Sequence, residues 1–116
     1  MKTRISRKRI HIAPVGFEID RIVLPAKRDK ADKVFLMVHS NRSKDKAKEY
    51  TAEIEKRLKR VKIETEQIPA DLWNIDEITR VTRDLILDNP GCEVAINLAS
   101  GSTNHSIGMD RACMTF

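Results

Sequence analysis

The stretch Glu-Val-Ala-Ile-Asn-Leu-Ala-Ser-Gly-Ser, residues 93–102, decides the fold that we expect for this chain. Its apolar run at residues 94–96 follows the turn signal Asn-Pro-Gly at residues 89–91 and leads into small hydroxylated residues. This pattern predicts a buried strand that opens onto a loop. Residues 103–115 carry apolar side chains at helical spacing and predict a helix. A strand-to-helix junction directs unpaired N–H groups and the positive end of the helix dipole at one point, which suits a phosphate-like anion.

The composition places the chain among globular proteins of one domain. Its 116 residues are 41% hydrophobic and 34% charged, which is sufficient for one core and unlike a disordered chain. The longest apolar runs, such as residues 34–38, are far shorter than the roughly 20 residues of a membrane span, and no apolar segment of a signal peptide follows the basic N-terminus. Cys92 and Cys113 indicate neither a disulfide framework nor a zinc site. We therefore expect a reduced, cytoplasmic protein without a metal, a cofactor or a membrane partner.

The formal net charge of +5 is concentrated at the N-terminus. Five basic and no acidic residues occur in residues 1–9, and they account for the whole excess of 22 Lys and Arg over 17 Asp and Glu. This basic arm is interpreted as a solvated tail, a cloning remnant or a phosphate contact. Residues 10–116 are neutral on balance and contain few aromatic residues, which argues against direct nucleic-acid binding by this part of the chain.

Predicted strands and helices alternate along the chain. Strands are predicted over residues 9–15, 33–39, 62–68 and 94–96, and helices over residues 18–27, 44–60, 75 to about 89, and 103–115. Pro25 is expected to shorten or kink the first helix. Asn74 and Glu77 form a predicted capping box at the start of the third.

Helical connections of this length imply right-handed crossovers and a parallel sheet. We predict an α/β fold with three layers: a Rossmann-like, doubly wound, mainly parallel sheet, whose strands have the order 3-2-1-4 if they follow the usual doubly wound pattern. Because the sequence stops at Phe116, we expect a domain over residues 10–116 that lacks its last strands. The first and fourth strands are neighbours in this order, at the point where the winding reverses and where ligands bind outside the carboxyl ends of the strands.

Two loops that contain glycine are expected to face each other across one crevice at this reversal. The first comprises Pro14, Val15, Gly16, Phe17 and Glu18; the second comprises Ala99, Ser100, Gly101, Ser102 and Thr103; and the exit of the second strand, with His39, Ser40 and Asn41, lies on the same edge. Neither loop is a GxGxxG or a Walker A motif. The hydroxyl groups around the second glycine form either a small anion nest or an ordinary helix N-cap.

Three segments carry a resemblance to a known family. They are Ile-Ala-Pro-Val-Gly-Phe-Glu-Ile-Asp-Arg-Ile-Val at residues 12–23, Asp-Lys-Val at residues 32–34 and Asn-Leu-Ala-Ser-Gly-Ser at residues 97–102. In this order they resemble CARF domains, the CRISPR-associated Rossmann-like sensors, and most closely the branch with a winged helix-turn-helix after the sensor. The likeness extends over about residues 10–114. The family commonly has a lysine directly after the Gly-Ser pair, where this chain has Thr103.

The resemblance implies the ligand-sensing domain of a CRISPR-associated transcriptional regulator. Its homodimer would bind a cyclic oligoadenylate or a similar nucleotide in a shared groove, and DNA would be bound only by a C-terminal domain that is not in this chain. The ligand contacts would come from residues 16–18 and 100–102, with Asn97 supporting the second loop. The missing lysine weakens the expected phosphate affinity.

A ring nuclease that cleaves such a messenger is the alternative function. The 2′-hydroxyl of the ligand would be the nucleophile, so the protein would need little beyond positioning and charge stabilisation. Candidate side chains for that reaction are Ser100, Ser102, Thr103, His39 and His105. No catalytic residue is assigned, because a lone histidine at a strand exit is more often a surface or packing residue, and His11, inside a strand, is interpreted as structural.

Overall fold

The structure of the protein is a computed structural model that describes residues 8–41, 43 and 45–97. Strands and helices alternate along this part of the chain, as the sequence predicts. The elements are β1 (Arg9–Pro14), α1 (Asp20–Arg28), β2 (Lys33–His39), α2 (Lys48–Arg60), β3 (Glu64–Ala70), α3 (Ile75–Asp88) and β4 (Glu93–Ile96).

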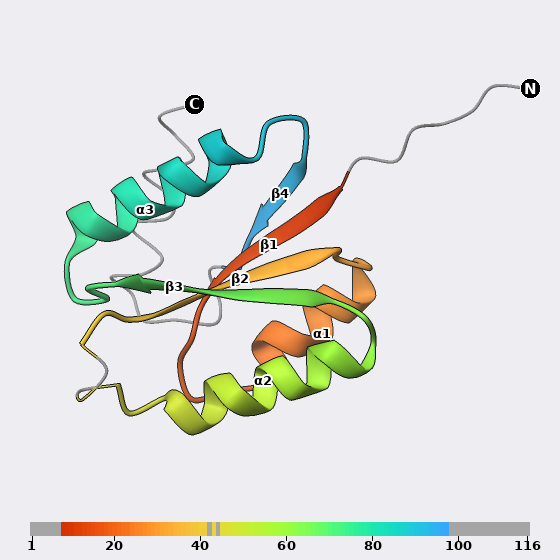
Figure 1. Ribbon diagram of the computed structural model, residues 1–116, viewed down its shortest axis with the longest axis horizontal. Coiled ribbons are helices and arrows are strands. Elements are labelled where there is room, and N and C mark those ends of the chain that lie inside the picture. Colours follow the sequence, from red (N-terminus) through yellow and green to blue (C-terminus); the bar gives the residue numbers. More distant parts are fainter. Residues whose placement is uncertain (1–7, 42, 44, 98–116) are drawn as a thin grey trace, which may run out of the picture.

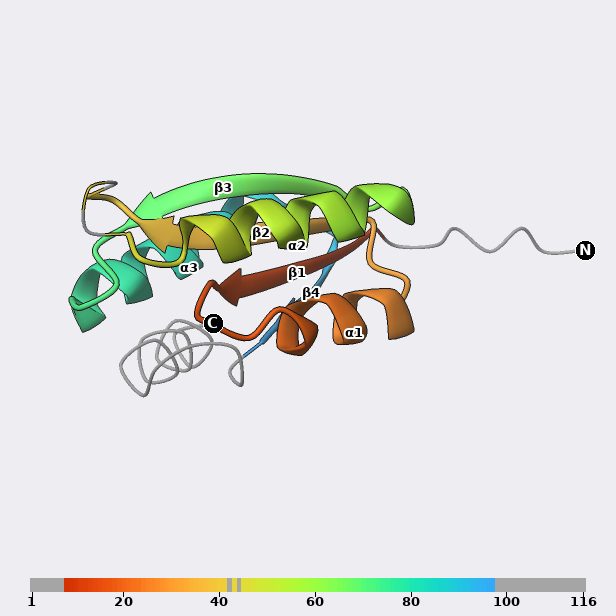
Figure 2. The same cartoon turned by 90° about the horizontal axis from the view of Figure 1, so that it is seen from below.

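The sheet has the strand order β3-β2-β1-β4, with all neighbours parallel. This order confirms the predicted doubly wound topology. Ile12 of β1 lies opposite Phe35 of β2 on one side and Ile96 of β4 on the other. Helices α1 and α2 cover one face and α3 covers the opposite face, which makes three layers (Figures 1 and 2).

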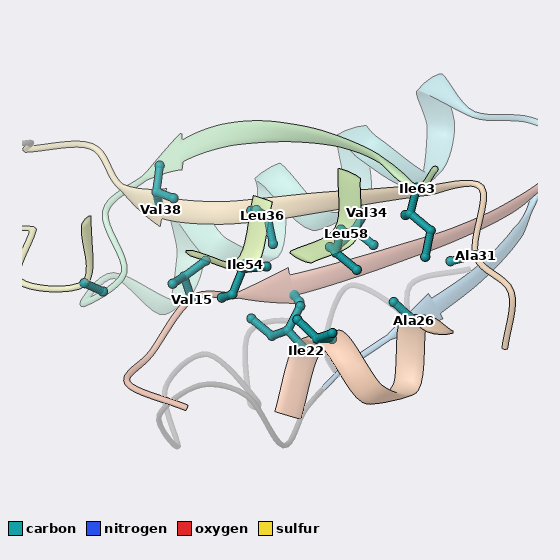
Figure 3. Close-up of a cluster of buried hydrophobic side chains, with 13 residues drawn as sticks. Val15, Ile22, Ala26, Ala31, Val34, Leu36, Val38, Ile54, Leu58 and Ile63 are labelled. Carbon is teal, nitrogen blue, oxygen red and sulfur yellow. The ribbon is translucent and has the colours of Figure 1, made fainter. Parts of the chain in front are cut away.

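A hydrophobic cluster fills the space on each face of the sheet. The first cluster lies towards α1 and α2, and Figure 3 labels Ile22, Leu36 and Ile54 within it. The second lies towards α3 and includes Met37 and Ile78. Successive side chains of β2 point to opposite clusters, so residues 34–38 are all buried, as a continuous apolar run in a parallel strand predicts.

Helix α2 and strand β3 both begin later than the sequence predicts. Before α2, the carboxylate Oδ1 of Asp45 accepts the N–H of Ala47 at 3.0 Å, so a turn occupies the first positions of the helix that the sequence predicts over residues 44–60. After α2, Lys62 has a left-handed φ of 63°, and the N–H of Ile63 donates to the carbonyl of Leu58 at 3.0 Å. The left-handed residue and this hydrogen bond are features of a Schellman motif at the end of the helix. Strand β3 therefore begins only at Glu64.

Strand β3 lies at an edge of the sheet and is half exposed, which fits the alternation of charged and less polar residues along it. Lys33 of β2 reaches across to it, with Nζ at 2.8 Å from Oε1 of Glu66 and 3.3 Å from Oε2 of Glu64. The hydrogen bond to Glu66 is the main reason that the pKa of Lys33 is raised above its usual value. The two carboxylates of β3 therefore pair with a lysine of the neighbouring strand β2 and help to stabilise the contact between these strands.

The predicted cap of α3 is present in part. The side-chain oxygen of Asn74 accepts the N–H of Glu77 at 3.1 Å. The carboxylate of Glu77 turns instead to the N–H of Asp71, at 2.5 Å, so the reciprocal half of the capping box is replaced by a bond that closes the preceding loop.

The prediction that β4 is buried is wrong for the described chain. Glu93 and Ala95 are exposed, and Val94 and Ile96 are only half-buried against the cluster below α3. Among the described strands, β4 is bonded only to β1, so its apolar run packs on one face. An alternating burial pattern is what an edge strand with one covered face shows.

Candidate functional site

The carboxyl ends of β1 and β4 lie side by side at one edge of the sheet. The N–H of Asn97 donates to the carbonyl of Ile12 at 2.9 Å, which extends their pairing one residue beyond β4. The first predicted loop and the approach to the second therefore leave the sheet from adjacent strands. Ala99, Ser100, Gly101, Ser102, Thr103 and His105 lie outside the described residues, so the convergence of the two loops stays a prediction.

Residues of the first loop differ in what they offer a ligand. Pro14 and Val15 are buried, and the N–H of Val15 donates to the carbonyl of Met37 at 3.0 Å (Figure 3 shows Val15 within the core). Gly16 is half-buried, whereas Phe17 and Glu18 are exposed. Their side chains are the part of this loop that solvent reaches.

An aromatic pair marks the surface of the first loop. The ring of Phe17 meets the ring of Tyr50, from α2, edge to face, with 5.5 Å between centroids and an interplanar angle of 81°. Phe17 nevertheless remains 62% exposed. Tyr50 lies within the helix that the sequence predicts over residues 44–60, but the sequence does not predict this contact, because the two rings meet only in the folded chain.

Charged side chains within and after the first loop form ion pairs with one another. Glu18 pairs with Arg21 one turn along the chain. Arg57 of α2 places Nε at 2.8 Å from Glu53 and Nη1 at 3.3 Å from Asp20. The Arg57 hydrogen bond lowers the pKa of the Glu53 carboxyl, and the same bond raises the pKa of Arg57. The lowered pKa of Glu53 suits charge pairing and not proton donation.

The chain that leaves β2 forms a turn that is held by hydrogen bonds between its own residues. Nδ1 of His39 accepts the N–H of Asn41 at 3.0 Å, and the side-chain oxygen of Asn41 accepts the N–H of Ser43 at 3.1 Å. The N–H of Ser40 donates to the carbonyl of Ala70 at 2.9 Å. Since the Nδ1 lone pair is already engaged, the geometry supports a structural role for His39 and not that of a general base.

His11 of β1 lies further from the carboxyl ends of β1 and β4, and so away from the predicted crevice. Its Nε2 is 3.2 Å from Oδ2 of Asp29, and its side chain is only 6% exposed. Burial lowers the pKa of His11, although the charge of Asp29 partly opposes that effect. A depression of about 390 Å³ beside it is lined by charged residues that include Arg9 and Glu93, which are joined at 3.1 Å. The sequence prediction that His11 is structural agrees with this geometry.

The described part of the chain holds no group of three His, Cys, Asp or Glu side chains placed to bind a metal ion. Within the same residues, no helix is long and apolar enough to cross a membrane. Cys92 is a free, half-buried thiol.

Three known proteins or families are similar to this chain. Residues 9–116 match the family described as "HFX_2341_N:-like, N-terminal". The protein MJ1513 of Methanocaldococcus jannaschii is 31% identical over 100 residues, which cover 81% of this chain and 30% of MJ1513. The chain therefore spans about a third of the length of that relative.

Can2 from Sulfobacillus thermosulfidooxidans, solved in complex with cyclic tetra-adenylate, is similar in structure. The TM-score is 0.73 at 14% sequence identity, over 88% of this chain and 28% of Can2. At this identity the likeness concerns the fold, and it confirms the Rossmann-like α/β architecture that the sequence predicts.

Proposed function

The chain belongs to the family described as "HFX_2341_N:-like, N-terminal", and from this premise we propose that it is a ligand-sensing domain that binds a cyclic oligoadenylate. The binding site is the carboxyl edge of the sheet, between the loop after β1 and the chain that follows β4. The observation that carries the proposal is the position of these strands. They are adjacent at the reversal of the winding, where doubly wound folds bind nucleotides.

The structural relative supports the choice of ligand. Can2 shares this fold and is solved with cyclic tetra-adenylate. The exposed ring of Phe17 offers a surface on which an adenine base can stack, and base stacking on an aromatic side chain is worth about 1–3 kcal/mol per base. The predicted hydroxyl-rich loop at residues 99–103 would supply hydrogen bonds to the phosphates.

We further propose a homodimer whose two crevices line one groove, so that a single cyclic ligand contacts both copies. In a longer protein, the ligand would shift the dimer and thereby an output domain that binds DNA. The lengths of the relatives leave room for such a domain, since this chain spans 30% of MJ1513 and 28% of Can2.

Titration calorimetry with cyclic tetra-adenylate and cyclic hexa-adenylate tests the proposal, with linear tetra-adenylate as the control. We expect saturable binding of one cyclic ligand per two chains and much weaker binding of the linear control. Chromatography of the same mixtures after incubation should show intact rings. Linear products would establish the ring-nuclease alternative instead, and no heat with either cyclic ligand would reject the proposed ligand class.

A further inference from the structure

One hydrogen bond joins the end of β4 to the first turn of α1. The side-chain amide Nδ2 of Asn97 donates to the main-chain carbonyl of Arg21 at 2.5 Å, across 76 residues of sequence. The main-chain N–H of Asn97 is bonded to Ile12 of β1 as well. Asn97 therefore holds three elements together directly before the second predicted loop.

Pro25 explains why that carbonyl accepts a side chain. In an α-helix the carbonyl of Arg21 accepts the N–H of the residue four positions later, which is Pro25, and proline has no N–H. Helix α1 nevertheless continues past Pro25 to Arg28. The amide of Asn97 thus replaces the hydrogen bond that Pro25 removes.

Arg21 also contacts the first predicted loop, because its guanidinium pairs with Glu18. A single residue of α1 therefore touches the loop after β1 through its side chain and the end of β4 through its main chain.

We propose that Asn97 is a positioning residue, which holds the exit of β4 against α1 and thereby sets the spacing of the two ligand loops. One N–H of its side-chain amide donates to Arg21, and the role that we propose is to hold the loop and not to bind the ligand. This role deepens the function proposed above and rests on it for the affinity measurement, whereas the measurements on the free protein are independent of it.

A double-mutant cycle of Asn97→Ala and Pro25→Ala tests the bond itself by urea unfolding. Asn97→Ala should raise the unfolding equilibrium constant about fivefold, the effect of one ordinary hydrogen bond. In the Pro25→Ala background the restored N–H can serve the Arg21 carbonyl, so Asn97→Ala should then raise that constant less than twofold. The same increase in both backgrounds would overturn the inference.

The positioning role is tested by calorimetry with cyclic tetra-adenylate. Asn97→Ala should weaken binding about tenfold, and adding Pro25→Ala should restore stability but not affinity, because the tether between β4 and α1 is still missing. The double variant also covers the case in which the single variant does not fold. Asn89 is the matched control: its side-chain amide donates to the carbonyl of Leu85 at 2.7 Å, within α3. Asn89→Ala should reduce stability similarly and leave affinity unchanged.

Hydrogen exchange separates failure of this inference from failure of the proposed function. In the free protein, the N–H at position 97 should exchange about tenfold faster in Asn97→Ala than in the wild type, and at the wild-type rate in Asn89→Ala. Should the wild type bind no cyclic oligoadenylate, the proposed function fails, while the cycle and the exchange rates still decide whether Asn97 holds β4 against α1. Wild-type affinity or wild-type exchange in Asn97→Ala would refute the positioning role.

Discussion

Towards the amino-terminal end of the β1–β4 pair, polar and charged side chains bond to one another, whereas at the carboxyl end an aromatic ring is left exposed. At the first end, His11 pairs with Asp29, and Arg9 pairs with Glu93 while its Nη1 donates to the carbonyl of Asp29 at 2.7 Å. At the second end, Phe17 contacts one neighbouring ring and keeps most of its surface in solvent.

The difference separates a structural polar cluster from a candidate ligand surface. Charged groups that already bond to one another add to stability and offer little to a ligand, even where they line a depression. A large apolar side chain held in place at the carboxyl edge has surface to offer a ligand. Changes in the polar cluster at the first end should therefore alter stability alone, and truncation of the exposed ring at the second should alter affinity with little effect on stability.

The largest effect that we expect is the loss of stability in His11→Ala. Truncation removes a buried ring and its contact with Asp29, which should lower the free energy of unfolding by about 2 kcal/mol. Affinity for cyclic tetra-adenylate should not change. His39→Ala is the control at the opposite end. Because His39 is only half-buried, its truncation should lower the free energy of unfolding much less in the same urea titration. Equal losses in the two variants would remove the contrast between the ends.

Phe17→Ala should weaken binding of cyclic tetra-adenylate about tenfold, since stacking of one base is worth about 1–3 kcal/mol. Stability should change little because the side chain is mostly exposed. Trp73→Ala provides a matched control, since this side chain is 72% exposed in the loop between β3 and α3. If Trp73→Ala weakens binding as much as Phe17→Ala, the ligand surface is not confined to the β1–β4 edge.

Thr103→Lys should strengthen binding of the same ligand about fivefold, which is the ~1 kcal/mol that two unit charges gain at 4 Å in water. The substitution restores the lysine that the resemblance to CARF domains implies at this position. The gain should disappear at high salt, because an exposed charge pair is screened. Thr103→Gln is the uncharged control, and an equal gain in that variant would contradict a phosphate contact.

The smallest effect is the pH dependence of stability due to His11. Burial lowers its pKa in the folded protein below the usual 6.5, so the unfolded chain binds a proton at higher pH than the folded one. This contribution to stability is complete above 6.5 and is lost as the pH falls from there towards the lower folded pKa. Urea midpoints measured across this range should fall in the wild type and fall less in His11→Ala. Parallel curves would show that another group is responsible.

The local pattern of the sequence was sufficient for the element types and for a parallel sheet, whereas the strand order followed only from the condition that the sheet is doubly wound. An apolar run at residues 34–38 requires a strand covered on both faces, and helical connectors require parallel neighbours. Element ends were less predictable. Lys30 and Lys62 adopt left-handed φ values at the ends of α1 and α2, where glycine would have been the recognisable signal.

The position of the candidate site on the sheet could be predicted from the sequence, but the side-chain contacts within it could not. Gly16 and its neighbours follow β1, and Asn97 follows β4, so the parallel sheet brings them to one edge. Burial of Val15, the ring contact between Phe17 and Tyr50, and the engagement of Asn97 by Arg21 depend on how the helices pack on that sheet.

The sequence by itself determined the alternation of strands and helices, the parallel topology and the edge at which the loops emerge, because hydrophobic periodicity and connection length act over a few neighbouring residues. Only the tertiary structure decided that the Asn97 amide serves the carbonyl freed by Pro25 and that His11 meets Asp29. Such contacts join residues far apart in the chain, and their geometry follows from the packing of whole elements.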